Sequence, residues 1–152
     1  MLETALLNYG MEPALCDITP IGSGLINHTW KVIFQNKSYI LQHINTAVFK
    51  HPQYIDDNIL LLSNYLKEHY PGYLFISPVK SLSGKTMICL GQSAYFRMLP
   101  FVENSRTYVA TGNKKQAYEA AKQFGRFTRL LSNLPLDRLK TVIPDFHNLS
   151  LR

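Results

Sequence analysis

The sequence contains few of the residues that mark several classes of protein. Its 152 residues include two cysteines, Cys16 and Cys89, which have apolar neighbours and are predicted to be buried free thiols and not a disulfide. No run approaches 18 consecutive apolar residues, which argues against a transmembrane helix. The N-terminus carries Glu3 and no basic segment, so it does not resemble a signal peptide. These absences predict a cytoplasmic protein without a membrane partner.

Motifs of several common chemistries are also lacking. The five histidines and two cysteines do not have the spacing of a metal site, and no Ser-His-Asp or Cys-His arrangement can be assigned. No glycine-rich loop is followed by Lys-Ser or Lys-Thr. The sequence therefore gives no support to a zinc site, a catalytic triad or a P-loop.

The net charge of +6 is unevenly distributed, because residues 1–100 have a net charge of +1 and residues 101–152 of +5. A basic C-terminal third is compatible with nucleic-acid binding. However, Lys115, Lys122 and Arg126 lie along one predicted helix, and no RNA-binding aromatic motif or helix-turn-helix pattern accompanies them. A solvated helix face is the favoured interpretation, so nucleic acid is not a predicted partner.

The first half of the chain has the pattern of three strands joined by short turns. A short amphipathic helix, ended by Gly10 and Pro13, comes first. Apolar runs at 18–21, 29–35 and 38–44 then predict strands, the second with a clear period of two. Gly22, Ser23 and Gly24 form the turn between the first two strands. A Gly-x-Gly turn often serves only as a turn, but it also lets the backbone approach a phosphate, as in kinases.

The second half combines two helices with further strand patterns. Pro52 begins a predicted helix with a regular apolar stripe, which ends at Pro71-Gly72. Strands are predicted at 74–82 and 85–90, and a third in the run 94–102, ending near Leu99 because Pro100 follows. Asn113 is the predicted N-cap of a long helix that Pro135 ends, with an apolar stripe from Ala117 to Leu134.

This order predicts an α+β fold, with a mainly antiparallel five-stranded sheet and one helix after the third strand. It is the order of a protein-kinase-like N-terminal lobe, followed by a hinge and the first helices of a C-terminal lobe. Residues 1–102 are predicted to form the nucleotide-binding lobe. Residues 103–152 are predicted to form the connector and the start of an incomplete second lobe.

Several segments in this order resemble the aminoglycoside phosphotransferase/choline kinase-like superfamily, and within it bacterial N-acetylhexosamine 1-kinase-like phosphotransferases. They cover most of residues 18–148. The segments are GSGLINHTW at 22–30, YILQHIN at 39–45, VFKHP at 48–52, IDDNI at 55–59, YFRMLPFVENSRTY at 95–108, AAKQFGRFTRLL at 120–131 and IPDFHN at 143–148.

The resemblance implies ATP-dependent phosphorylation of a small sugar or amino-alcohol acceptor, in particular an amino sugar at its anomeric hydroxyl. It implies that the loop 22–29 covers the triphosphate, that Gln42 or His43 occupies the place of the usual phosphate-pairing lysine, and that Asp57 is its helix partner. The backbone of 98–102 would take the adenine. The implied nucleotide-binding residues are Gly22, Ser23, Gly24, Asn27, His28, Thr29, Gln42, His43, Asp57, Met98, Pro100, Phe101 and Val102.

Two residues depart from the pattern of these sugar kinases. The pattern has Asn-Asp-Thr where this sequence has Asn27-His28-Thr29, and a cationic residue where it has His43. A histidine that is neutral at pH 7 stabilises phosphate charge less than arginine or lysine does. The residue expected to contact the phosphates is therefore Gln42 or His43 or, if neither does so, Lys31.

The catalytic aspartate and the Mg²⁺ ligands of phosphoryl transfer have no counterpart in the chain. In this superfamily they belong to a His-x-Asp…Asn loop and a later aspartate motif. The run at 145–148 has the wrong order and follows the helix too closely, so it is interpreted as a connector. We expect a truncated part of a larger kinase, which binds ATP, takes Mg²⁺ only with the missing lobe and has no catalytic residues of its own.

Two other functions are compatible with the sequence. The chain would be a non-catalytic module that keeps the fold and forms a homodimer through exposed apolar surface. Alternatively, it would bind nucleic acid through its basic C-terminal third, with a steep dependence of the affinity on salt.

Overall fold

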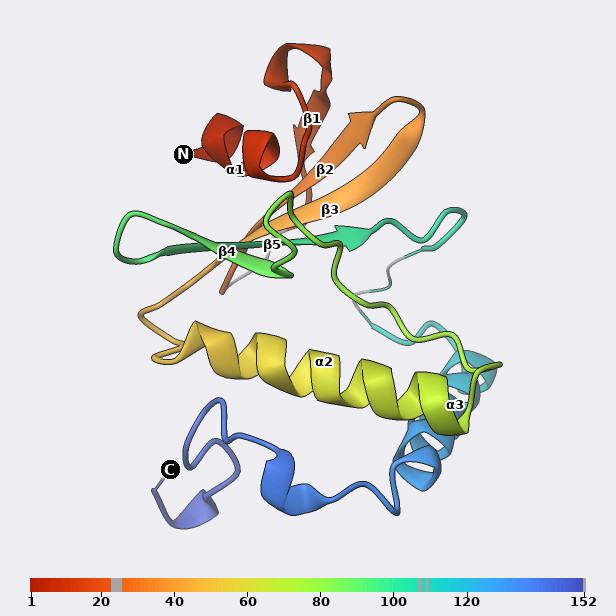
Figure 1. The fold of residues 1–152 in the computed structure, drawn as a ribbon. Helices are drawn as coiled ribbons and strands as arrows, with labels where there is room; N and C mark the ends of the chain where they lie inside the picture. The colour runs from red at the N-terminus through yellow and green to blue at the C-terminus, as the bar shows by residue number, and fades with distance from the viewer. Residues whose placement is uncertain (23–25, 107, 109, 152) are drawn as a thin grey trace.

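Five antiparallel strands form one sheet in the computed structural model, which describes residues 1–22, 26–106, 108 and 110–151 (Figure 1). The strands are β1 (Asp17–Pro20), β2 (His28–Phe34), β3 (Lys37–Ile44), β4 (Met87–Leu90) and β5 (Ala94–Pro100), in the spatial order β1-β2-β3-β5-β4. The helices are α1 (Leu2–Asn8), α2 (Pro52–His69) and α3 (Lys114–Leu130), with 3-10 turns at Pro13–Leu15, Leu136–Arg138 and Leu149–Leu151. The predicted α+β fold, with one helix between the third and fourth strands, is confirmed.

The turn between β2 and β3 has two residues, as the predicted strands at 29–35 and 38–44 imply, but it lies one residue earlier than the predicted 36–37. Phe34 pairs with Lys37, so Gln35 and Asn36 form a two-residue loop in which both have positive φ, 49° and 60°. Such a turn has the twist that suits an antiparallel hairpin. It sets the register of β2 against β3, and this register places Thr29 directly opposite Gln42.

The sheet has two chemically different faces, because side chains alternate along each strand. One face, here called the core face, presents Val32, Leu41 and Met98, which are fully buried together with Ala5 and Leu6 of α1. The opposite face, here called the α2 face, presents the polar side chains of Gln42 and Arg97 as well as the buried Ile44, and is turned toward α2, which lies below the sheet (Figure 1). The main hydrophobic cluster therefore lies between the sheet and α1. Gln42 and Arg97 lie on the other side of the sheet, which faces α2.

The helix α2 begins at Pro52, whose fixed φ suits the first turn, and ends before Tyr70, as the sequence predicted. Leu66 is its most deeply buried apolar residue, at 1% exposure. On the side away from the sheet, the segment that follows α3 runs beneath α2 (Figure 1). The helix is thus enclosed between the sheet and the C-terminal part of the chain.

The predicted strand at 74–82 does not form, and β4 is shorter than the predicted 85–90. The backbone N–H groups of this segment bond to three separate partners: Val79 to Met98, Ser81 to Lys85, and Leu82 to Asn8. A strand needs successive bonds to one neighbour, and a proline inside the segment has no N–H to offer. The predicted turn at Gly84 does form, with φ +80°.

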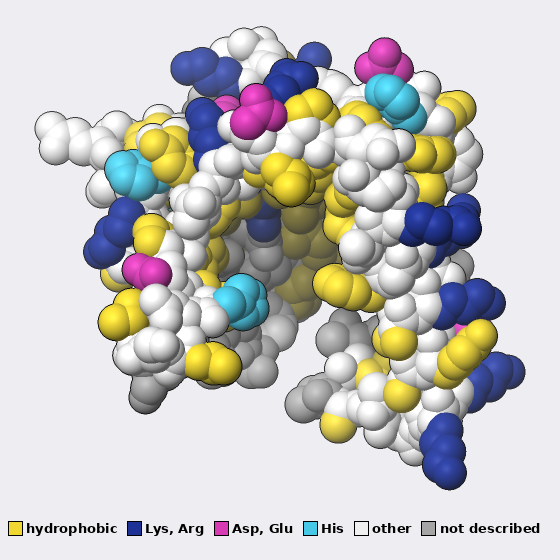
Figure 2. Space-filling view, turned by 90° about the horizontal axis from the view of Figure 1, so that it is seen from below, with side chains coloured by type: hydrophobic (Ala, Val, Ile, Leu, Met, Phe, Trp, Pro, Cys, Tyr) yellow, Lys and Arg dark blue, Asp and Glu magenta, His cyan; other side chains and the backbone are white. Residues whose placement is uncertain are grey.

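The helix α3 has the predicted cap but packs differently along its length. The Gln116 N–H donates to Oδ1 of Asn113 at 3.0 Å, as expected for an N-cap. Phe124 is 73% exposed, whereas Leu130 and Leu134 are buried. The predicted apolar stripe is therefore open in its first half and packed in its second. Figure 2 shows basic side chains gathered on the right-hand flank, where α3 lies.

Both cysteines are free, as predicted, but they are not buried in the way the sequence suggested. Cys16 is partly buried and Cys89 is exposed. Cys89 lies on β4, an edge strand of the sheet, and apolar neighbours in the sequence do not ensure cover at an edge. Among the described helices, none is both long and apolar enough to cross a bilayer.

Candidate functional site

The structure separates the two residues between which the sequence could not choose. Gln42 and His43 are neighbours on β3, so their side chains point to opposite faces of the sheet. His43 lies on the core face, where its ring stacks on Phe96 with the centroids 4.7 Å apart. Gln42 lies on the α2 face. Of the two, Gln42 is therefore the residue on the face turned toward α2, and its role in phosphate binding stays a prediction.

Gln42 belongs to a row of three hydrogen-bonded side chains that crosses the sheet. Thr29, Gln42 and Arg97 are direct neighbours in the register of β2, β3 and β5. The Gln42 amide donates to Oγ1 of Thr29 at 3.3 Å and accepts from Nε of Arg97 at 3.0 Å. This polar row links the end of the glycine turn to the middle of the sheet.

Asp56 on α2 is the acidic residue that faces the polar row. Its Oδ2 accepts a 2.7 Å hydrogen bond from Oγ1 of Thr86. Burial raises the pKa of Asp56, while burial lowers the pKa of Arg97, and the attraction between the two charges opposes both shifts. Oδ1 of Asp56 and Nη1 of Arg97 are buried and have no hydrogen-bond partner among the residues that the structure describes. The Arg97 guanidinium and the Asp56 carboxylate are therefore near enough to attract one another, and each keeps one buried atom that forms no hydrogen bond with the described residues.

Asp57, the predicted helix partner, lies on the outer side of α2. Its carboxylate is 2.5 Å from Nζ of Lys140, in the segment after α3. Next to it, the Asn58 side chain forms two hydrogen bonds with the Lys140 backbone, at 2.8 and 2.9 Å. These contacts attach the C-terminal segment to α2, so the structure places Asp56, and not Asp57, beside the sheet.

The glycine turn is described in part, since Ser23 and Gly24 lie outside the described residues. Gly22 has φ +76°, a conformation that side chains other than glycine rarely adopt. Oδ1 of Asn27 accepts a 3.0 Å hydrogen bond from the Asn45 N–H and so ties the turn to the end of β3. A cavity of about 120 Å³ lies between residues 20–22 and 27–30, with His28 and Thr29 among its walls.

The stretch 98–102 connects the sheet to the rest of the chain and is partly bonded within the protein. The Met98 side chain is fully buried on the core face, and the Phe101 N–H donates to the Ser38 carbonyl at 3.1 Å. Nζ of Lys31 lies over the Phe101 ring, 4.3 Å from its centroid. Lys31, the third candidate for the phosphate contact, is thus directed toward this connector. Pro100 has no N–H, and Val102 is 43% exposed.

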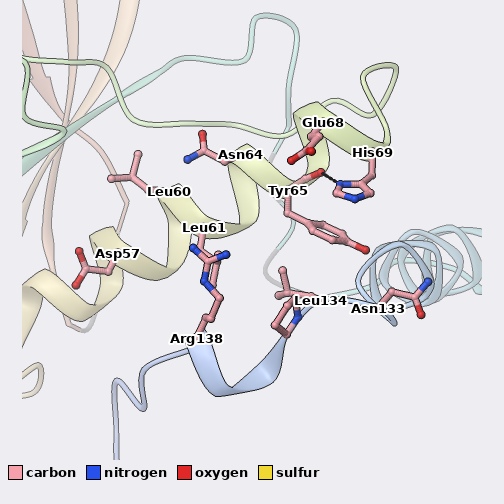
Figure 3. Close-up of a pocket in the computed structure, with 11 residues that line it drawn as sticks. Asp57, Leu60, Leu61, Asn64, Tyr65, Glu68, His69, Asn133, Leu134 and Arg138 are labelled. Atoms are coloured by element: carbon pink, nitrogen blue, oxygen red, sulfur yellow. Dashed lines mark hydrogen bonds between the residues drawn. The ribbon is translucent and has the colours of Figure 1, made fainter.

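A second, larger cavity lies on the other side of α2. It has a volume of about 470 Å³ and separates α2 from the segment 133–138 (Figure 3). Asp57, Asn64 and Glu68 are among its lining residues on the helix, and Leu134 and Arg138 line it from the facing segment. It has no contact with the polar row, from which the body of α2 separates it.

His43 gives a pH-dependent prediction. Burial, with a smaller effect of His28, lowers the pKa of His43 below its ordinary 6.5. The unfolded chain then binds a proton that the folded state resists, so folded stability is lost as the pH falls from 6.5 through the lowered pKa. We expect His43→Phe to remove this loss. As the pH is lowered from 7.5 to 5, the free energy of unfolding of His43→Phe should increase relative to that of the original protein.

The measurement is urea unfolding followed by circular dichroism at several pH values, with the exposed His147→Gln as the comparison variant. A difference between His43→Phe and the original protein that stays constant with pH would mean that His43 is not held neutral in the core.

The sheet order and the helix after β3 define the fold of a kinase-like N-terminal lobe. No protein-family model matches the sequence. The chain is similar in structure to spectinomycin phosphotransferase APH(9)-Ia, solved with ADP and spectinomycin, at a TM-score of 0.62 and 19% sequence identity. It is also similar to amicoumacin kinase hAmiN, solved with AMP-PNP, Ca²⁺ and Ami, at a TM-score of 0.70 and 21% identity.

The similarity covers nearly the whole of this chain and less than half of each kinase. It extends over 90% of this chain and 39% of the spectinomycin phosphotransferase, and over 91% of this chain and 42% of amicoumacin kinase. The chain therefore spans about two fifths of the length of these kinases. The shared part confirms the predicted fold class, and the roles of individual residues remain predictions.

Proposed function

We propose that this chain is the nucleotide-binding portion of an ATP-dependent small-molecule kinase. The observation that carries the proposal is the polar row of Thr29, Gln42 and Arg97, which faces Asp56 and begins in β2, the strand that follows the glycine turn. Kinases hold the phosphates at this place between the sheet and the following helix. The two similar structures, each solved with an adenine nucleotide, support the same function.

Different described residues would bind the phosphates and the adenine of the nucleotide. The turn at Gly22 would cover the phosphates with backbone N–H groups, and the stretch 98–102 would hold the adenine. Because the Phe101 N–H already bonds to Ser38, the Phe101 carbonyl and the Val102 N–H are the groups of this stretch that would bind the base. Thr29 and Gln42 would line the phosphate site from the sheet, held in place by their hydrogen bond to one another.

The acceptor that we propose is an amino sugar, phosphorylated at its anomeric hydroxyl in the carbohydrate metabolism of the cytoplasm. The resemblance of the segments at 22–30, 39–45 and 95–108 to N-acetylhexosamine kinases supports this choice. Residues 1–102 would form the nucleotide lobe, and residues 103–152 the connector and the start of the acceptor lobe. Acceptor specificity would depend mainly on that second lobe.

Magnesium would have to be bound largely by other groups. Among the described residues, no three His, Cys, Asp or Glu side chains come together as ligands, so these residues do not fit a metal site of their own. We therefore assign nucleotide binding to this chain and no step of the transfer. With ATP and N-acetylhexosamines the chain by itself should show no turnover in a coupled assay.

Calorimetry with AMP-PNP tests the proposal directly. The original chain should bind AMP-PNP, and Gly22→Val should bind it about tenfold more weakly. A β-branched residue is strained at φ +76°, so the turn would move away from the position in which its N–H groups meet the phosphates.

Gly91→Val is the matched control, because Gly91 has a similar φ of +64° in the turn between β4 and β5, away from the proposed site. It should lose similar stability but keep the affinity for AMP-PNP. If the original chain does not bind AMP-PNP, or if both variants lose affinity equally, the proposed site is wrong.

A dimerisation module is the second candidate, because Phe124 and Tyr118 on α3 are 73% and 63% exposed. Sedimentation velocity over a range of concentrations distinguishes the two. A dimer that Phe124→Glu dissociates, in a chain that does not bind AMP-PNP, would favour the module over the kinase portion.

A further inference from the structure

The polar row contains one cation whose position is fixed but whose bonding is incomplete. Arg97 lies in the middle of β5, on the α2 face, directly opposite Gln42. Its Nε is occupied by the Gln42 amide oxygen, which orients the plane of the guanidinium. Its Nη1 is buried and has no hydrogen-bond partner in the described part of the protein. Buried donors of this kind are normally satisfied, so the missing partner points to a ligand.

Given nucleotide binding as proposed above, we propose that Arg97 on β5 is the cation that binds the nucleotide phosphates in this chain. It takes the role that a β3 lysine has in kinases, while Gln42, at the lysine position, orients it. A guanidinium presents several N–H donors in a planar fork that matches phosphate oxygens. Nη1 is the donor that would make such a contact, since it has no partner among the described residues, and because it is buried the side chain would have to turn toward the phosphate on binding.

The other candidate cations are directed elsewhere. Nζ of Lys31 lies over the Phe101 ring at 4.3 Å, at the connector end of the sheet. His43 is on the core face, stacked on Phe96. Among the cations that the sequence analysis considered, neither joins the row that begins at Thr29, next to the glycine turn. Arg97 does, through Gln42.

Asp56 holds the charge of Arg97 without occupying its donors. The two charges attract one another, yet no ion pair within 4.0 Å joins them among the described residues. Instead, the Asp56 carboxylate is held by Thr86 at 2.7 Å. A purely structural ion pair would be expected to close. The open pair leaves a donor of the guanidinium without a partner among the described residues, while the charge of the aspartate attracts the cation.

Calorimetry with AMP-PNP and with adenosine separates phosphate contacts from base contacts. Arg97→Gln is expected to weaken AMP-PNP binding about tenfold and to change adenosine binding less than twofold. Arg97→Lys should be intermediate, because it keeps the charge and loses the fork. The exposed Arg129→Gln on α3 is the matched control and should bind both ligands as the original protein does.

A measurement on the unaltered chain covers the case in which Arg97→Gln does not fold. In a ¹⁵N–¹H spectrum, the Nε–Hε signal of Arg97 should shift on addition of AMP-PNP and stay unchanged on addition of adenosine. If a folded Arg97→Gln binds AMP-PNP as tightly as the original, or if the signal does not respond, the role of Arg97 is refuted while nucleotide binding stands. If the original chain binds neither ligand, the proposed function itself fails.

Discussion

Replacing Leu41 with alanine is expected to lower the free energy of unfolding by about 3 kcal/mol. Leu41 is fully buried at the centre of β3, where it lies between Trp30 and Met98 in the register of the sheet. The substitution removes apolar contacts and leaves a cavity that the surrounding strands cannot close, because β3 is hydrogen-bonded on both sides. The loss should be the largest of any single substitution considered.

Urea unfolding followed by circular dichroism measures this loss. Leu74→Ala is the matched control, since Leu74 is 79% exposed and its replacement should change the free energy of unfolding by less than about 0.5 kcal/mol. A loss of less than about 1 kcal/mol for Leu41→Ala would show that the core is not centred on β3.

Replacing Asn58 with alanine is expected to release the C-terminal segment from α2. The Asn58 side chain donates to the Lys140 carbonyl and accepts from the Lys140 N–H, so both bonds vanish together. With about 1 kcal/mol for each bond, local opening of the segment should become roughly 30-fold more frequent. The exposed ion pair between Asp57 and Lys140 contributes little by itself and would not hold the segment.

Limited proteolysis and amide hydrogen exchange both report this opening. Cleavage and exchange around residues 136–142 should accelerate in Asn58→Ala, while the strands keep their protection. Asn64→Ala is the matched control, because Asn64 is an exposed asparagine six residues further along α2. Equal rates in the two variants would mean that the segment is held by other contacts.

The regular parts of the fold could be predicted because their patterns are local. The alternation in β2, the stripe of α2 and the cap of α3 at Asn113 each depend on residues close in sequence. The segment 74–82 could not, because its backbone bonds are distributed among the sheet, a turn and the last residue of α1. Extended apolar composition alone does not distinguish this arrangement from a strand.

The candidate site was predictable in outline and not in its residues. The period of two along β3 was enough to place Gln42 and His43 on opposite faces, but which face met α2 required the structure. Asp56 and Asp57 are adjacent, and only the orientation of α2 decides which one faces the sheet. Arg97 was overlooked, although a single arginine inside the apolar strand AYFRMLP was a visible signal.

The contacts on both sides of α2 have a consequence for motion. In regulated protein kinases the corresponding helix controls activity through its position beside the lysine. Here a single turn, residues 56–58, is attached to Thr86 on the sheet side and to Lys140 on the other. A movement of the helix away from the sheet would have to break the bond to Thr86 and displace the segment bonded at Lys140. The fold therefore favours a helix that stays in register with the sheet whether or not a ligand is bound.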